Sequence, residues 1–307
     1  MIPLFNFKSS SWVGLDIHAN EVRLVVLKRE KHSICLKSIG VQELKPGVIM
    51  DGRIADFEQL QSALRMLVDR TETRGCPTVI ALPAQSIITH RIQSPSYLTD
   101  KERELEISLN LKNYFPDVTS ELAFDFAVLH SSSPSEYDNI VLVAVRLEQL
   151  MDFVGVVNKA GLMVKIADID SFALARSLKW SYPVKNTIAI FDGKHFFVFH
   201  HHELLFSQSI VDSHASIVDC IQQLKRAIRF CLSTHRELHL DQMFLCGKDN
   251  AFAELAQEIQ KECSIRVNYI DPFAAMKLAS SLDIKLVHAL SSRMLVSCGL
   301  ALRSVLA

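Results

Sequence analysis

The stretches Trp12–Glu21 (WVGLDIHANE) and Ile188–His195 (IAIFDGKH) decide the fold. Each is an apolar run that ends at an aspartate, Asp16 or Asp192, and each continues through a short polar turn into another apolar run. An apolar run bounded by a turn is typical of a buried β-strand. Two such units, one opening each half of the chain, predict two related subdomains that face each other. In that arrangement the two aspartate turns meet across a cleft, where a nucleotide phosphate and its metal would bind.

Length and composition indicate an ordinary globular protein. The chain has 307 residues, of which 49 % are hydrophobic and 22 % charged, and its formal net charge is −1. This length is at or just past the size at which one core splits into two, and the charge balance does not indicate a nucleic-acid binder. No apolar stretch reaches the ~20 residues of a membrane span. The N-terminal Met1–Lys8 lacks the features of a signal peptide.

Cysteine usage predicts a cytoplasmic location. The seven cysteines form an odd number, contain no C-x-x-C pair, and stand mostly inside apolar runs. This pattern is typical of reduced core thiols rather than of disulfides or a zinc site.

The hydrophobic pattern predicts an α/β chain with three strands opening each half. Thr99 and Glu102 form a capping box, which predicts a helix that runs to about Tyr114. The segment Ser181–Asn186 (SYPVKN) has the composition of a linker. We therefore expect a first lobe over residues 1–185 and a second lobe over residues 186–307.

Several segments resemble the PilM family, the actin-like cytoplasmic proteins of type IV pilus assembly. The resemblance covers nearly the whole chain and includes the related pilus systems of the MSHA and HofM type. It rests on the order and spacing of Val13–Ile17, Pro46–Ile49, Asp51–Ile54, Ala160–Leu162, Asp168–Leu174, Asp271–Phe273 and Gly299–Arg303.

The resemblance implies an α/β, actin-like (ribonuclease-H-like) two-lobed fold with an α+β subdomain inserted in the first lobe at about residues 80–165. It implies that the final helix, with Leu300 and Leu302, returns to the first lobe. It also implies a partner, a PilN-like inner-membrane protein whose cytoplasmic tail lies in a groove beside the inserted subdomain. The chain would then be a scaffold at the inner membrane, attached through its partner.

The nucleotide motifs are where the chain departs from the family. A typical member carries a glycine and small hydroxyl residues after the first aspartate, whereas this chain has His18–Glu21 (HANE). The second turn and the adenosine motif are also poor in glycine. The candidate remnants of a nucleotide site are Asp16, Asn20, Asp192, Gly193 and Gly247.

The lost glycines matter because turns that cradle phosphate aim backbone N–H groups at it, often with positive φ. Each charge-assisted hydrogen bond contributes roughly 1.5–3 kcal/mol, so two losses convert an affinity of ~1 μM to weaker than ~1 mM. We expect a degenerate site with no catalytic residue, no metal ligands and weak or absent binding of ATP and Mg. Asp16 and Asp192 either hold Mg through water or hydrogen-bond their own turns. Glu21 either repels a phosphate or points outward.

Two other functions stay open. A functional actin-like ATPase or phosphotransferase needs intact phosphate turns and a carboxylate near the γ-phosphate, for which the sequence offers no strong candidate. An FtsA-like polymer-forming protein would carry a C-terminal amphipathic membrane helix, which is missing here; self-association stays open. The run His200–Glu203 (HHHE) is either a weak metal site or, as we favour, a hairpin tip, because only His200 and His202 share a face of a strand.

Overall fold

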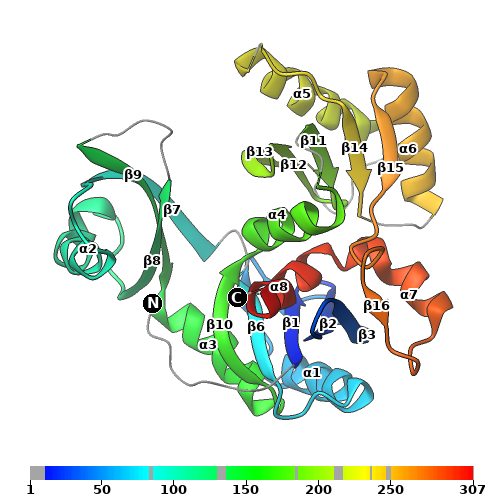
Figure 1. Cartoon of the computed structure of the whole chain (residues 1–307), viewed down its shortest axis with the longest axis horizontal. Helices are drawn as coiled ribbons and strands as arrows, with labels where there is room; N and C mark the ends of the chain where they lie inside the picture. The colour runs from blue at the N-terminus through cyan, green and yellow to red at the C-terminus, as the bar shows by residue number, and fades with distance from the viewer. Residues whose placement is uncertain are drawn as a thin grey trace.

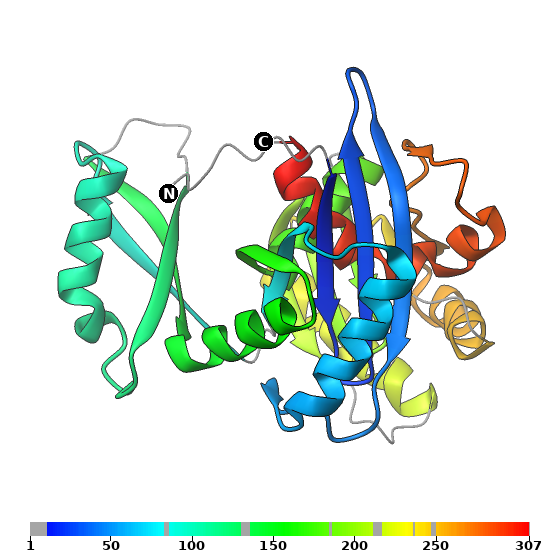
Figure 2. The ribbon, with the colours of Figure 1, turned by 90° about the horizontal axis from the view of Figure 1, so that it is seen from below.

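The computed structural model describes residues 11–82, 86–129, 136–183, 186–210, 217–235, 237–246 and 250–306. Within these residues the strands form two central sheets, a smaller three-stranded sheet and a two-stranded hairpin, and helices pack against the three larger sheets. The smaller sheet and helix α2 stand to one side of the rest in both ribbon views (Figures 1 and 2).

The first central sheet has six strands in the order β10-β6-β1-β2-β3-β16. Strands β1, β2 and β3 are antiparallel neighbours, and β6 and β10 continue the sheet in parallel. Helices α1 and α3 cover one face, because their apolar stripes pack against Val13, Leu15 and Leu24. The bounds are β1 (Ser11–Ile17), β2 (Glu21–Arg29), β3 (Ile34–Glu43), β6 (Pro77–Leu82), β10 (Met163–Ile169), β16 (Lys277–Leu278), α1 (Phe57–Thr71) and α3 (Leu147–Lys159), with the small hairpin β4 (Ile49–Met50) and β5 (Arg53–Ile54) before α1.

The second central sheet has five strands in the order β13-β12-β11-β14-β15. Helices α5 and α6 pack on one face, and helix α4 packs on the other through Leu174 and Leu178. His201 and His202 adopt positive φ in the turn between β12 and β13, so the predicted hairpin tip is confirmed. The bounds are β11 (Thr187–Phe191), β12 (His195–His200), β13 (Glu203–Ser209), β14 (Gln242–Leu245), β15 (Arg266–Tyr269), α4 (Asp170–Ser181), α5 (Ile217–Thr234) and α6 (Asn250–Cys263).

The smaller sheet is an antiparallel unit in the order β7-β9-β8 with α2 on one face. The capping box of Thr99 and Glu102 is present at the start of α2, as predicted. Strands β6 and β10, which overlap the two ends of the expected range of about 80–165, belong to the first central sheet. The stripe of Phe153, Val156 and Val157 likewise commits α3 to the first core. The bounds are β7 (Ile87–Pro95), α2 (Asp100–Tyr114), β8 (Leu122–Leu129) and β9 (Tyr137–Arg146).

The C-terminal segment crosses from the second sheet back to the first. Strand β16 pairs with β3, and Phe273 and Met276 pack with apolar residues of β2 and β3. The chain therefore returns to the first sheet soon after β15, before the final helix that was expected to make this crossing. It continues through α7 (Ile284–Leu290), the 3-10 turn η2 (Ser291–Arg293) and α8 (Leu295–Leu306), which lies on the face of the first sheet opposite α1.

Close backbone contact fixes α8 on the first sheet. A Cβ on Gly14 of β1 would lie 1.9 Å from the carbonyl oxygen of Ser297, so glycine is required at this position.

In the part of the chain that the structure describes, no single helix is long and apolar enough to cross a membrane. Among the described residues, the bent pair formed by α7 with η2 and by α8, at an angle of 96°, is long and apolar enough only when its two parts are taken together.

Candidate functional site

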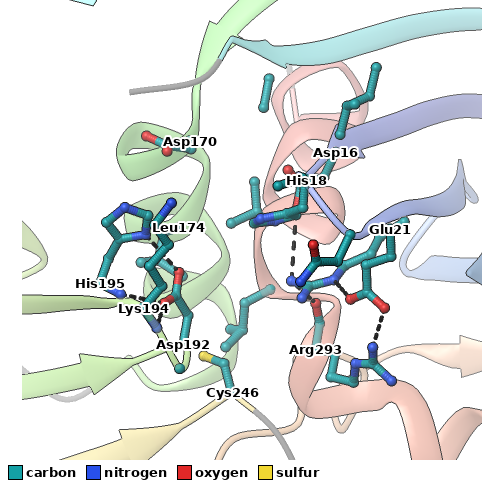
Figure 3. Close-up of a pocket in the computed structure, with 18 of the residues that line it drawn as sticks. Asp16, His18, Glu21, Asp170, Leu174, Asp192, Lys194, His195, Cys246 and Arg293 are labelled. Carbon is teal, nitrogen blue, oxygen red and sulfur yellow. Dashed lines mark hydrogen bonds and ion pairs between the residues drawn. The ribbon is translucent and has the colours of Figure 1, made fainter. Parts of the chain in front are cut away.

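A cleft of about 530 Å³ lies between the aspartate turns of the two central sheets. Its charged lining comes from the turns after β1 and β11, from the start of β2, from the turn between β4 and β5, from the start of α4 and from the end of η2. Figure 3 shows most of these side chains. The charged and histidine side chains of the lining are Asp16, His18, Glu21, Arg23, Asp51, Asp170, Asp192, Lys194, His195 and Arg293.

The first turn holds its aspartate through side chains. Asp16 is buried at the end of β1, and Nε2 of His18 lies 2.7 Å from its Oδ2. A guanidinium nitrogen of Arg23 lies 3.9 Å from the same oxygen. None of residues 18–20, all of them described, has a positive φ. The carboxylate is therefore held by neighbouring side chains, and the turn lacks the glycine-type backbone of a phosphate cradle.

Glu21 points into this network rather than outward. Its Oε1 accepts a 2.6 Å hydrogen bond from Nε of Arg23, and its Oε2 pairs with Arg293. Arg23 also donates to the backbone oxygen of Arg293 at 3.0 Å. Glu21 and Arg23 are both largely buried, whereas the side chain of Arg293 is 37 % exposed. The charges of Asp16 and Glu21 balance those of the two arginines at the floor of the cleft.

The second turn holds its aspartate through its own backbone. Asp192 Oδ1 accepts hydrogen bonds from the N–H groups of Lys194 at 2.8 Å and His195 at 2.6 Å, and Gly193, which lies between Asp192 and Lys194, has φ 98°. Burial raises the pKa of Asp192. The hydrogen bonds and charge of His195, with the N–H of Lys194, outweigh that effect and bring the pKa to about 2. Burial lowers the pKa of His195. The hydrogen bond to Asp192 and the charge of Asp192 raise this pKa by more, so the net effect is a raised pKa.

Asp170 is a cleft residue that sequence reasoning missed. It is the first residue of α4, and its Oδ1 accepts the N–H of Ser171 at 2.6 Å. Burial raises its pKa to about 6, with a further contribution from the charge of Asp16 and partial compensation by the Ser171 N–H. The signal in the sequence was an acidic residue at a strand-to-helix junction, in a segment that already carried the family resemblance.

The sequence-predicted residues divide into two groups. Asp16, Asn20, Asp192 and Gly193 all line the cleft. The backbone oxygen of Asn20 accepts a 2.8 Å hydrogen bond from the N–H of Leu44, which ties the first turn to the end of β3. Gly247 lies outside the described residues. Within the described ranges, no group of three or more His, Cys, Asp or Glu side chains is placed to hold a metal ion.

The cationic floor of the cleft was also missed. Arg23 lies in the predicted strand, where alternation gives no hint that its side chain reaches the cleft. Arg293 comes from a position 272 residues away from Glu21. The sequence carries no local signal for a contact over that separation.

Two α/β lobes, a cleft between paired aspartate turns and a C-terminal segment that crosses back to the first sheet define an actin-like fold. A family model described as type IV pilus assembly protein PilM matches residues 14–196 and 215–305, and the chain belongs to this family. The family and the fold class predicted from the sequence are thus confirmed.

Solved structures show the same fold. A PilM-PilN type IV pilus biogenesis complex matches with a TM-score of 0.77 at 20 % identity, over 95 % of this chain and 98 % of that one. The ethanolamine utilization protein EutJ from Carboxydothermus hydrogenoformans matches with a TM-score of 0.50 at 12 % identity, over 97 % of this chain and 91 % of that one. At these identities the likeness concerns the fold alone.

Proposed function

We propose that this chain is a non-catalytic scaffold of type IV pilus assembly that binds the cytoplasmic tail of a PilN-like inner-membrane protein. Family membership supports the first part of the proposal. The similarity to a solved complex of PilM with PilN supports the choice of partner. The protein would then lie at the cytoplasmic face of the inner membrane, held there by its partner.

A groove of about 350 Å³ beside the inserted subdomain carries the proposal. Strand β5 and helix α3 form its wall on the side of the first lobe, and the loop before β8 and the end of β9 form the other wall. Buried Ile54 and Phe153 give it an apolar base. The lining residues are Arg53, Ile54, Thr119, Ser120, Arg146, Glu148, Gln149, Asp152 and Phe153.

The groove suits an extended peptide. Strand β8 is an edge of the smaller sheet, and Thr119 and Ser120 lie in the loop that leads into it, with Glu121 between Ser120 and the strand. An exposed edge pairs with the backbone of an added strand, while side-chain pockets select its sequence. The charged groups at the groove carry both signs, so a tail with mixed charge fits better than a purely acidic or basic one.

This binding mode does not require a nucleotide. In the central cleft, the N–H groups of Lys194 and His195 are already donated to Asp192, and Glu21 occupies Arg23 and Arg293. A phosphate there would meet groups that are already paired, together with the carboxyl side chains of Asp16, Glu21, Asp51, Asp170 and Asp192. The residues therefore do not fit a bound nucleotide phosphate with its Mg, and we derive no hydrolytic step.

Titration with a labelled tail peptide tests the proposal. The peptide is taken from the cytoplasmic end of a membrane protein of the same assembly system, and binding is followed by fluorescence anisotropy with and without Mg-ATP. Ser120→Trp should weaken binding at least about tenfold, because the indole fills the groove. Ser280→Trp, at an exposed serine far along the chain, is the matched control and should bind normally.

The cleft variants complete the test. Asp16→Ala and Asp192→Ala should bind the tail as the wild type does. If no tail binds, if Ser120→Trp binds normally, or if binding strictly requires ATP, the scaffold proposal is wrong.

Asp170 favours a second candidate, an ATP-binding actin-like ATPase. A half-buried carboxyl with a pKa of about 6 in an interlobe cleft is the type of group that general-base chemistry uses. Calorimetry with Mg-ATP decides between the two functions. A dissociation constant in the low micromolar range, lost in Asp16→Ala and in Asp192→Ala, would establish this candidate and refute the degenerate cleft.

A further inference from the structure

We propose that Arg23 and Arg293 form a built phosphate-binding site in the cleft, and that the carboxylate of Glu21 occupies it as an internal anion. The inference rests on the proposed function, since it names the device that keeps the cleft of a scaffold from binding phosphate. It concerns the central cleft, whereas partner binding concerns the groove beside the inserted subdomain.

The geometry is that of an anion clamp. Glu21 presents one carboxylate oxygen to Nε of Arg23 and the other to Arg293, so each oxygen faces a different guanidinium (Figure 3). Guanidinium groups bind phosphate oxygens with the same fork geometry that they use for carboxylates. The atoms that hold Glu21 are therefore those that would hold a phosphate in its place.

The clamp is pre-organised. Arg23 is fixed by its 3.0 Å hydrogen bond to the backbone oxygen of Arg293, which joins β2 to the turn before α8. Its side chain is only 12 % exposed, so little rotamer freedom remains to be lost when an anion binds. Arg293 reaches the clamp from the more open side of the cleft.

The charge balance explains why the native site is closed to phosphate. With Glu21 in place, two arginines face two carboxylates, Asp16 and Glu21, and the floor of the cleft is close to neutral. An incoming phosphate would add charge beside Glu21 at short range, and a repulsion of unit charges ~4 Å apart is substantial in a partly buried site. Without Glu21 the floor is cationic and two guanidinium groups are free to donate.

The test removes the internal anion. Glu21→Ser removes the carboxylate and opens space, whereas Glu21→Gln removes the charge but keeps the volume. Inorganic pyrophosphate is titrated into folded wild type and variants by calorimetry. We expect roughly 100-fold tighter binding in Glu21→Ser than in the wild type. Glu21→Gln should show a smaller gain of about tenfold, because its amide still fills the site.

Arg293→Met in the Glu21→Ser background is the matched control and should abolish the gain. Circular dichroism and thermal melts establish that each variant is folded; if Glu21→Ser does not fold, the gain in Glu21→Gln and its loss with Arg293→Met decide the question. A wild type that binds pyrophosphate as tightly as the variants would overturn the inference, as would folded variants without any gain or a gain that survives Arg293→Met.

Tail binding provides the independent readout. The Glu21→Ser variant should bind the tail peptide in the groove as the wild type does. If Glu21→Ser binds the tail but gains no affinity for pyrophosphate, only the role of Glu21 as an internal anion is refuted. If Glu21→Ser gains affinity for pyrophosphate but no tail binds, only the scaffold proposal is refuted.

Discussion

The two aspartate turns that face each other across the cleft use different chemistry at equivalent places. In the second lobe, Asp192 is held by the N–H groups of its own turn, and Gly193 provides the positive φ that brings them together. In the first lobe, Asp16 is held by His18 and Arg23, and its turn contains no glycine. In the turn of Asp192, the backbone N–H groups that could bind a phosphate are donated to the aspartate itself. In the turn of Asp16, side chains hold the aspartate in place of backbone N–H groups.

Under the proposal that the cleft does not bind a nucleotide, the two turns represent two routes by which such a cleft can close to its ligand. A backbone cradle closes when a carboxylate from the same turn takes its donors. A cationic floor closes when an acidic side chain pairs with its arginines. Both routes keep buried polar groups satisfied, as a stable cleft requires, so loss of ligand binding need not cost stability.

The largest effect is expected beneath the first turn, where α8 lies against the backbone of β1. A Cβ at Gly14 would lie 1.9 Å from the oxygen of Ser297 and 2.6 Å from the nitrogen of Ala301, so Gly14→Ala forces α8 away from β1. We expect a loss of about 3 kcal/mol or more in the free energy of unfolding. The measurement is urea denaturation.

The matched change in the second lobe is Ile190→Val, which removes a methyl group from a buried side chain two residues before Asp192. It should cost only about 1 kcal/mol. Equal losses in the two variants would contradict the view that backbone contact with α8 sets the first turn apart.

The next effect separates the two aspartates. Asp192→Ala leaves the N–H groups of Lys194 and His195 without their acceptor, and backbone groups cannot rotate to new partners. We expect a loss of about 2–3 kcal/mol. Asp16→Ala should cost about half as much, because Arg23 retains Glu21 and the half-exposed His18 can turn to solvent. Thermal denaturation at pH 7 compares the two variants, and a larger loss for Asp16→Ala would reverse the assignment of roles.

These contrasts also show what the sequence could predict. Apolar runs that end at Asp16 and Asp192 specify buried strands followed by turns, so the two lobes and their facing turns follow from local pattern. The capping box at Thr99 and the hairpin tip at His201 are local for the same reason. Hydrogen bonds and side-chain alternation over a few residues determine all of these features.

What could not be predicted depends on contacts between distant segments. The pairing of Glu21 with Arg293 requires the chain to cross back between lobes, and the half-burial of Asp170 arises only when α4 is packed between them. The core that α3 joins is a further example, because the apolar stripe of this helix fits any core of suitable shape. Periodicity identifies that a helix is buried on one face, but not which core it joins.

The third prediction concerns Asp170, which belongs to neither turn but lies beside both. Its pKa of about 6 in the folded protein is above the ordinary value of an aspartate, so the folded state favours the neutral acid. The stability that protonation supplies is complete below about pH 4 and is lost as the pH rises through about 6. At pH 7.5 the wild type therefore carries a destabilising buried charge.

Asp170→Asn is neutral at every pH and should exceed the wild type in stability by about 1–2 kcal/mol at pH 7.5, with the difference vanishing near pH 4. Urea denaturation at both pH values measures it, with Asp117→Asn, at an exposed position, as the control substitution. If the advantage of Asp170→Asn is the same at pH 4 and pH 7.5, protonation of Asp170 is not its cause.

The smallest effect returns to the backbone of the two turns. Gly193 has φ 98°, a backbone conformation that residues other than glycine adopt only with strain. Ala19, in the corresponding turn of the first lobe, does not have a positive φ. Gly193→Ala should therefore destabilise the protein by about 1 kcal/mol. Ala19→Gly should cost no more than about 0.5 kcal/mol, since it relieves no strain and only adds freedom to the unfolded chain. Thermal melts of the two variants, measured side by side, compare the turns directly. A larger loss of stability in Ala19→Gly than in Gly193→Ala would mean that the first turn is the more sensitive to its backbone residue. The second turn would then not depend on a glycine-type backbone, and the proposed difference between the two lobes would be wrong.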